Sequence, residues 1–149
     1  MSDIAWEIRH AVDADASPAF VWSYWTDVAN WDDPPAKFEL DGPFVAGSCG
    51  RTRLPEHEPL HWLIREVTPP SAATIEMQLE GATLTFAWRF ESIAEGRTRL
   101  IQQIVLRGEK ADVYLWQARS TFAANLPAGM NKLARAIANA YASARVPGR

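Results

Sequence analysis

Residues 98–141 read TRLIQQIVLRGEKADVYLWQARSTFAANLPAGMNKLARAIANAY, and within this stretch a strand pattern gives way to a helix pattern. From Thr98 to Leu106, alternate positions are apolar, which is typical of a strand with one face toward a core. From Lys110 onward, apolar residues recur at the spacing of an α-helix. Pro127 interrupts this helix and predicts a kink or a short break. A strand that leads into one long amphipathic helix decides the fold class.

Upstream of residue 98 the chain carries a series of strand patterns separated by turn residues. We expect strands at 37–40, 50–54, 60–67, 73–79 and 83–90, with glycine and proline residues marking the turns between them. The connections are short enough for hairpins, so neighbouring strands are expected to be antiparallel.

The N-terminal part adds one strand and two short helices. Ile4 to Val12 alternates as a strand, Ser17 and Pro18 form a favourable start for a helix, and Asp27 caps a second helical turn. Trp22, Trp25 and Trp31 are expected to pack these helices on the sheet. The order of one strand, two short helices, about six strands and one long helix predicts an α+β fold. We expect a single domain over residues 1–149, with the helices on one face of an antiparallel sheet.

Composition excludes several classes of function. Fifteen Lys and Arg against eighteen Asp and Glu give a net charge of −3, and no basic stripe exists for nucleic acid or anionic membranes. No apolar run approaches the roughly 20 residues that span a bilayer, and the N-terminus lacks a signal-peptide pattern. Cys49 is the only cysteine, so no intrachain disulfide can form. We expect a cytoplasmic protein.

Four motifs carry a resemblance to a known superfamily. They are Ser17–Trp22 (SPAFVW), Asp27–Trp31 (DVANW), Leu40–Gly47 (LDGPFVAG), and the pair Gly108–Asp112 (GEKAD) with Leu126–Met130 (LPAGM). On these motifs the chain resembles the polyketide cyclase/dehydrase-like branch of the START-related, birch-pollen-allergen-like superfamily, SRPBCC. The resemblance implies the helix-grip fold, a curved antiparallel sheet of about six or seven strands around a long C-terminal helix. It also implies a hydrophobic cavity between sheet and helix.

Two polar residues fall on the inward phase of their strands. His10 lies on the apolar phase of the first strand, where it could act as a general acid or base. Gln102 lies on the apolar phase of the last strand, where it could orient a polar group of a ligand. Structural roles stay open for both, since a buried His can bond to a backbone carbonyl and a buried Gln to a neighbour or water. Glu76 and Arg89 fall on the outward phase.

Apolar residues on the inward phases are the candidate walls of the cavity, because aromatic side chains dominate small-molecule pockets. Each has ordinary core packing as its alternative. The candidate ligand-binding residues are Trp62, Phe86, Trp88, Phe90, Ile104, Trp116, Met130, Leu133 and Ile137. Val113, Trp116, Gln117 and Ser120 are expected to share one face of the helix, and Trp116 is the candidate wall residue on it.

No metal site and no cofactor are expected. Glu56, His57, Glu58 and His61 form the most metal-like cluster, but Pro59 excludes a helix, and on a strand residues four apart lie roughly 13 Å from each other. No Gly-rich phosphate loop or dinucleotide motif is present.

Three functions stay open, because the superfamily that the chain resembles includes lipid carriers, cyclases and chaperone-ATPase activators. The favoured one is binding of a small hydrophobic molecule that is a lipid, aromatic or polyketide-like. The second is a cofactor-independent polyketide cyclase or dehydratase, and the third is a protein-interaction module. We expect a monomer or homodimer whose partner is the small molecule.

Overall fold

The computed structural model describes residues 4–145 as an α+β fold. The elements are β1 (Ile4–Ala14), α1 (Pro18–Trp25), η1 (Val28–Asn30), β2 (Lys37–Leu40), β3 (Cys49–Arg53), β4 (Leu60–Thr68), β5 (Ala72–Leu79), β6 (Ala82–Ala94), β7 (Arg97–Arg107), η2 (Ala111–Tyr114), α2 (Leu115–Ala118), η3 (Arg119–Ala123) and α3 (Ala124–Ala144). The predicted element order is confirmed. The longest strands exceed their predicted ranges, since β1 continues past Val12 and β6 past Phe90.

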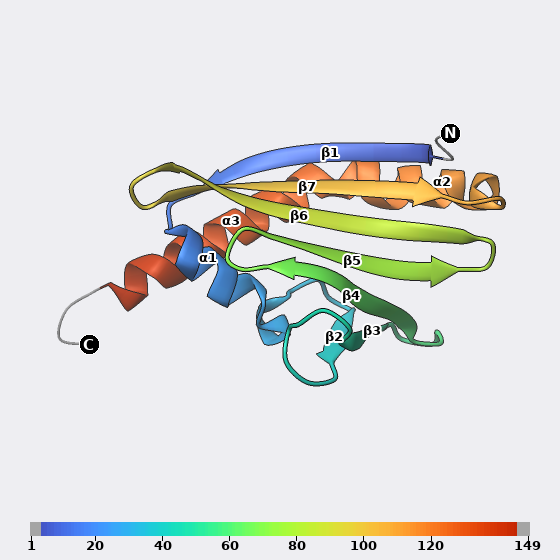
Figure 1. The fold of residues 1–149 in the computed structure, drawn as a ribbon, viewed down its shortest axis with the longest axis horizontal. Coiled ribbons are helices and arrows are strands. Elements are labelled where there is room, and N and C mark those ends of the chain that lie inside the picture. The colour runs from blue at the N-terminus through green and yellow to red at the C-terminus, as the bar shows by residue number, and fades with distance from the viewer. Residues whose placement is uncertain (1–3, 146–149) are drawn as a thin grey trace.

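The seven strands form one sheet in the order β1-β7-β6-β5-β4-β3-β2, and every pair is antiparallel. The long C-terminal helix lies behind this curved sheet, running from the end near α2 toward α1 (Figure 1). This arrangement is the helix-grip fold, as the motifs implied. Within residues 4–145, no helix combines the length and the apolarity that a membrane span requires.

Both predicted caps of the short helices form. The Ser17 side chain accepts a hydrogen bond from the Phe20 N–H at 3.3 Å, and Pro18 occupies the first turn of α1. The Asp27 carboxylate accepts from the Ala29 N–H at 3.1 Å and starts η1, a single 3₁₀ turn. Both caps satisfy backbone donors that the first helical turn leaves unpaired.

The strand register divides the sheet into two faces. Residues opposite one another on neighbouring strands lie on the same face. Ile64 of β4, Ile75 of β5, Phe86 of β6, Ile104 of β7 and Ile8 of β1 form one such row, and we call the face that they share the inner face. The inner face packs on the helices and carries the core, and the opposite face is the outer face.

The C-terminal helix contains a π-helical turn immediately before its proline. Pro127 has no N–H to donate to the carbonyl of Ala123, and its ring crowds that carbonyl. The π-helix η3 ends at Ala123, so the wider turn accommodates the missing hydrogen bond. The break predicted at Pro127 is therefore a local widening, and the helical run continues to Ala144.

Candidate functional site

A polar row crosses the inner face on the three longest strands. His10 of β1 lies opposite Gln102 of β7, and Gln102 lies opposite Trp88 of β6. The Cα atoms of such neighbours are about 4.5–5.5 Å apart. The sheet therefore brings together the two residues that the sequence offered as candidate catalytic groups. We call His10, Gln102 and Trp88 the polar row.

The Gln102 amide is nearly buried and has no partner. Gln102 is 8% exposed, and its side chain makes no hydrogen bond to another residue in the part of the chain that the structure describes. In that same part, no fully buried side-chain nitrogen or oxygen lacks a hydrogen-bond partner. The amide must therefore face a space that water can reach. His10 is half-buried, and its imidazole also makes no hydrogen bond to a described residue.

Apolar rows flank the polar row on both sides. They consist of Ile8, Ile104 and Phe86 on one side, and of Val12, Leu100 and Phe90 on the other. Ile104 and Phe90 are buried, whereas Phe86 and Trp88 remain partly exposed although they lie on the core face. Two hydrogen-bonding side chains among accessible apolar ones are typical of a site that binds an apolar molecule and orients its polar end.

The C-terminal helix supplies the opposite wall. Met130 and Ile137 are buried and Leu133 is half-buried, as expected for residues that face the sheet. Phe122 of η3 meets Phe86 edge to face, with ring centroids 5.6 Å apart. The π-helical turn thus brings a ring onto the inner face, and the sequence analysis did not predict this position of Phe122.

The other end of the inner face is filled with aromatic rings. Trp25 of α1 lies 5.2 Å from Trp88 and 5.3 Å from Phe90, measured between ring centroids. Trp31 lies 5.5 Å from Trp62 and donates its indole N–H to the Trp25 carbonyl at 2.6 Å. Trp22, Trp25 and Trp31 therefore pack the short helices on the sheet, as predicted. This aromatic cluster makes Trp62 and Phe90 part of a solid core.

The predicted inward face of the α2 region is wrong. Trp116 is 78% exposed and Val113 is 73% exposed, and Gln117 and Ser120 also lie on the surface. The face toward the sheet is formed instead by Ala111, Leu115, Ala118 and Phe122, whose spacing follows the helical period. All four of these residues are apolar, whereas the predicted face combines Val113 and Trp116 with the polar Gln117 and Ser120, so the two large side chains outweighed the pattern of the whole turn. Trp116 therefore does not line the inner face.

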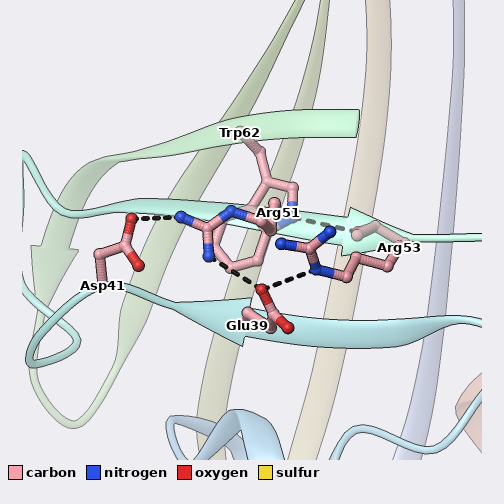
Figure 2. Close-up of polar contacts among 6 residues, drawn as sticks. Glu39, Asp41, Arg51, Arg53 and Trp62 are labelled. Atoms are coloured by element: carbon pink, nitrogen blue, oxygen red, sulfur yellow. Dashed lines mark hydrogen bonds and ion pairs between the residues drawn. The ribbon is translucent and has the colours of Figure 1, made fainter. Parts of the chain in front are cut away.

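An ion cluster on the outer face ties β2 to β3 (Figure 2). Arg51 Nη1 lies 2.9 Å from Glu39 Oε1 and Nη2 lies 2.6 Å from Asp41 Oδ2, while Arg53 Nε lies 2.9 Å from the same Glu39 oxygen. The hydrogen bonds from Arg51 and then Arg53 hold the pKa of the Glu39 carboxyl below its ordinary value. On the opposite face of these strands, the Trp62 indole N–H donates to Thr52 Oγ1 at 3.1 Å.

A second feature of the outer face is a shallow groove over Ile101. Arg99 and Asp13 line it and pair at 2.9 Å, and the hydrogen bond from Arg99 lowers the pKa of Asp13. Arg9 and Glu91 complete its rim with one charge of each sign. Because the charges are mixed and Arg99 is already paired, this groove does not select a ligand of either charge.

The metal-like cluster is dispersed. Glu56, His57 and Glu58 lie in the exposed loop before β4, and His61 is exposed on β4 opposite Arg51, on the outer face. Among residues 4–145, no three or more His, Cys, Asp or Glu side chains gather as a metal site would require. As expected for the outward phase, Arg89 is exposed and Glu76 pairs with Arg65 at 3.7 Å.

Solved structures share this architecture at low sequence identity. Norcoclaurine synthase from Thalictrum flavum, with a transition-state analogue bound, aligns with a TM-score of 0.69 and 11% identity over 92% of this chain and 97% of its own. The Zhui aromatase/cyclase from Streptomyces sp. R1128 aligns with a TM-score of 0.69 and 17% identity, over 88% of this chain and 92% of its own. Protein Ms6760 from Mycobacterium smegmatis aligns with a TM-score of 0.62 and 15% identity, over 97% of this chain and 99% of its own. These similarities show the fold.

A search of curated proteins finds no match to this chain. A family described as polyketide cyclase / dehydrase and lipid transport matches residues 5–138, which include every element from β1 to most of α3. The chain belongs to this polyketide cyclase/dehydrase and lipid transport family, within the SRPBCC superfamily that its motifs resemble.

Proposed function

We propose that this protein binds a small hydrophobic molecule, a lipid or an aromatic or polyketide-like compound, between the inner face and the C-terminal helix. The family supports a role in ligand binding or cyclisation. The observation that carries the proposal is the Gln102 amide, which is nearly buried and unpaired among accessible apolar side chains. A bound hydroxyl or carbonyl would replace the water that reaches this amide with a hydrogen bond, and such a bond contributes about 0.5–1.5 kcal/mol.

The proposed contacts lie where the inner face is accessible. Phe86 and Trp88 from the sheet and Leu133 from the helix are partly exposed and would touch the ligand. Ile104 and Met130 would form the base of the site, since both are buried beside these residues. Trp62, Phe90 and Ile137 would support the site from within the core and have no direct contact.

Titration with N-phenyl-1-naphthylamine, an uncharged dye that fluoresces in apolar sites, tests the location. Ile8→Trp places a large ring on the inner face beside Ile104 and should weaken dye binding at least about tenfold. Ala11→Trp places the same ring on the outer face of the same strand and should leave binding unchanged. Equal effects of the two variants, or no binding by the native protein, would refute the proposal.

A second function is favoured by the pairing of His10 with Gln102. An imidazole beside an amide can move a proton at a carbon next to a carbonyl, which is the chemistry of a cofactor-independent cyclase or dehydratase. The test is His10→Ala assayed for binding and turnover with the molecules extracted from the purified protein. Turnover that disappears while binding persists supports the enzyme. Unchanged behaviour in both assays supports the binding protein.

A further inference from the structure

The charged residues of the sheet all avoid the inner face. By register, Glu7, Arg9 and Asp13 of β1 lie opposite Val105, Gln103 and Arg99 of β7, on the outer face. Arg89 and Glu91 of β6 follow the same phase, as do Lys37, Glu39, Arg51 and Arg53 of the β2–β3 pair. On β4 and β5, Arg65 pairs with Glu76, which lies opposite Thr85 on the outer face. A register shift after Ile64 places the exposed Glu66 opposite Thr74, on the same outer face. Arg97 and Arg107 are exposed at the ends of β7.

The helices that cover the inner face add no charge to it. Helix α1 contains no charged residue. Arg119 of η3 and Arg135 of α3 are exposed, and Lys132 pairs with Asp32 at 3.1 Å outside the core. Thr98, the other buried polar residue, donates its hydroxyl proton to the Ala16 carbonyl at 2.8 Å. Among the described residues, the buried or half-buried side chains with polar groups left to meet a ligand near the centre of this face are therefore those of the polar row, His10, Gln102 and Trp88.

A charged ligand would lose its hydration here without gaining an ion pair. Transfer of an ionised carboxylate to an apolar environment is far more costly than transfer of a neutral hydroxyl or amide that finds a hydrogen bond. The imidazole of His10 and the amide of Gln102 supply hydrogen-bonding groups that suit a hydroxyl or a carbonyl. The rings of Phe86 and Phe122 lie beside the polar row, which itself includes the ring of Trp88, and these rings favour a flat ring system.

We infer that the ligand is an uncharged ring compound whose hydroxyl or carbonyl binds at His10 and Gln102, and that anionic amphiphiles such as fatty acids are excluded. This inference rests on the proposed function and narrows its ligand class. It makes Gln102 the specificity-determining residue, because its amide is nearly buried and makes no hydrogen bond to another described residue.

Three probes that share one ring system test the inference by displacement of N-phenyl-1-naphthylamine. They are 2-naphthol, 2-methylnaphthalene and 2-naphthoate, compared at a mildly alkaline pH where free imidazole is neutral. We expect 2-naphthol to displace the dye at a concentration at least about tenfold lower than either of the others. In Gln102→Met, 2-naphthol should lose most of this advantage over 2-methylnaphthalene, while 2-methylnaphthalene keeps its own affinity.

The outcomes separate this inference from the proposed function. If the dye binds at the inner face but 2-naphthoate displaces it as well as 2-naphthol does, the ligand class is wrong and the binding site stands. If 2-naphthol and 2-methylnaphthalene are equal in the native protein, the polar row plays no part and the inference fails. If the dye does not bind, or Ile8→Trp leaves its binding unchanged, the proposed function itself fails and the inference falls with it.

Discussion

At the scale of single residues, the role proposed for Gln102 is separable from stability. Its amide is 8% exposed and makes no hydrogen bond to a described residue, so an apolar side chain of similar length would remove no hydrogen bond within the protein and would bury more apolar surface. We predict that Gln102→Met leaves the free energy of unfolding unchanged or raises it by up to about 1–2 kcal/mol, while binding of a hydroxyl-bearing ligand weakens. Urea denaturation measures the first quantity. A clear loss of stability would mean that Gln102 is structural.

Gly50 is required by the ring of Trp62. The two residues lie opposite each other on β3 and β4, and a Cβ at Gly50 would collide with the indole ring. We predict that Gly50→Ala lowers the free energy of unfolding by about 1–3 kcal/mol because the ring and its neighbour Trp31 must shift.

The matched control is Gly129→Ala in the C-terminal helix, where a Cβ would meet open space. This substitution should raise the free energy of unfolding by about 0.5–1 kcal/mol, because alanine favours the helix more than glycine does. Thermal denaturation of both variants gives opposite signs if the packing at Gly50 is as described. No loss in Gly50→Ala would contradict the packing against Trp62, and a loss in Gly129→Ala would contradict the open space described at that position.

At the scale of elements, Pro127 accounts for the π-helical turn before it. Pro127→Ala restores the N–H that the Ala123 carbonyl lacks, and the expected result is an ordinary α-helical turn in place of Arg119–Ala123. The free energy of unfolding should rise by up to about 3 kcal/mol. Amide hydrogen exchange of residues 119–126 should slow. If the exchange rates of these amides do not change, the cause of the π-helical turn is the Phe122–Phe86 contact and not Pro127.

The β2–β3 pair predicts a pH dependence of stability. Arg51 and Arg53 lower the pKa of Glu39 from its ordinary 4.5, so the ionised form stabilises the folded state. This contribution is complete above pH 4.5 and is lost as the pH falls toward the lowered pKa. Glu39→Gln should therefore destabilise the protein most at neutral pH, with a difference that shrinks in acid. Urea denaturation across pH measures it, and Glu95→Gln, which removes an exposed carboxylate without an ion pair among described residues, should show no such trend.

The sequence predicted the order of the helices and strands. It also predicted which side chains of the long strands face inward, but not which side chains of the α2 region do. Alternation along β1, β6 and β7 identified which side chains face inward, because a strand has a strict period of two. His10 and Gln102 were placed on the correct face for this reason, but their contact depends on a register between strands some 90 residues apart, which no local pattern contains. In the α2 region, the prediction followed the large side chains of Val113 and Trp116, which are exposed. It therefore missed the face that packs on the core, which ends at Phe122.

At the scale of the whole molecule, the inner face of the sheet is filled with aromatic side chains at one end and partly accessible at the other. The aromatic cluster of Trp25, Trp31 and Trp62 joins α1 and η1 to β3 and β4, whereas the accessible part lies on β1, β7 and β6 beneath η3 and α3. Figure 1 shows the long helix behind the sheet, and α3 contacts β1, which lies at the opposite edge of the sheet from β2.

A ligand should therefore stabilise the molecule unevenly. At a concentration 100 times its Kd, a ligand that binds only the folded state adds about 2.7 kcal/mol to the free energy of unfolding. Amides that exchange by local opening should slow in β1, β7, η3 and α3, which contact the site, and not in β2 and β3. Hydrogen exchange with and without 2-naphthol measures this distribution. Protection centred on η1, β2 and β3 would instead place the ligand in the aromatic cluster, and it would require those rings to separate on binding.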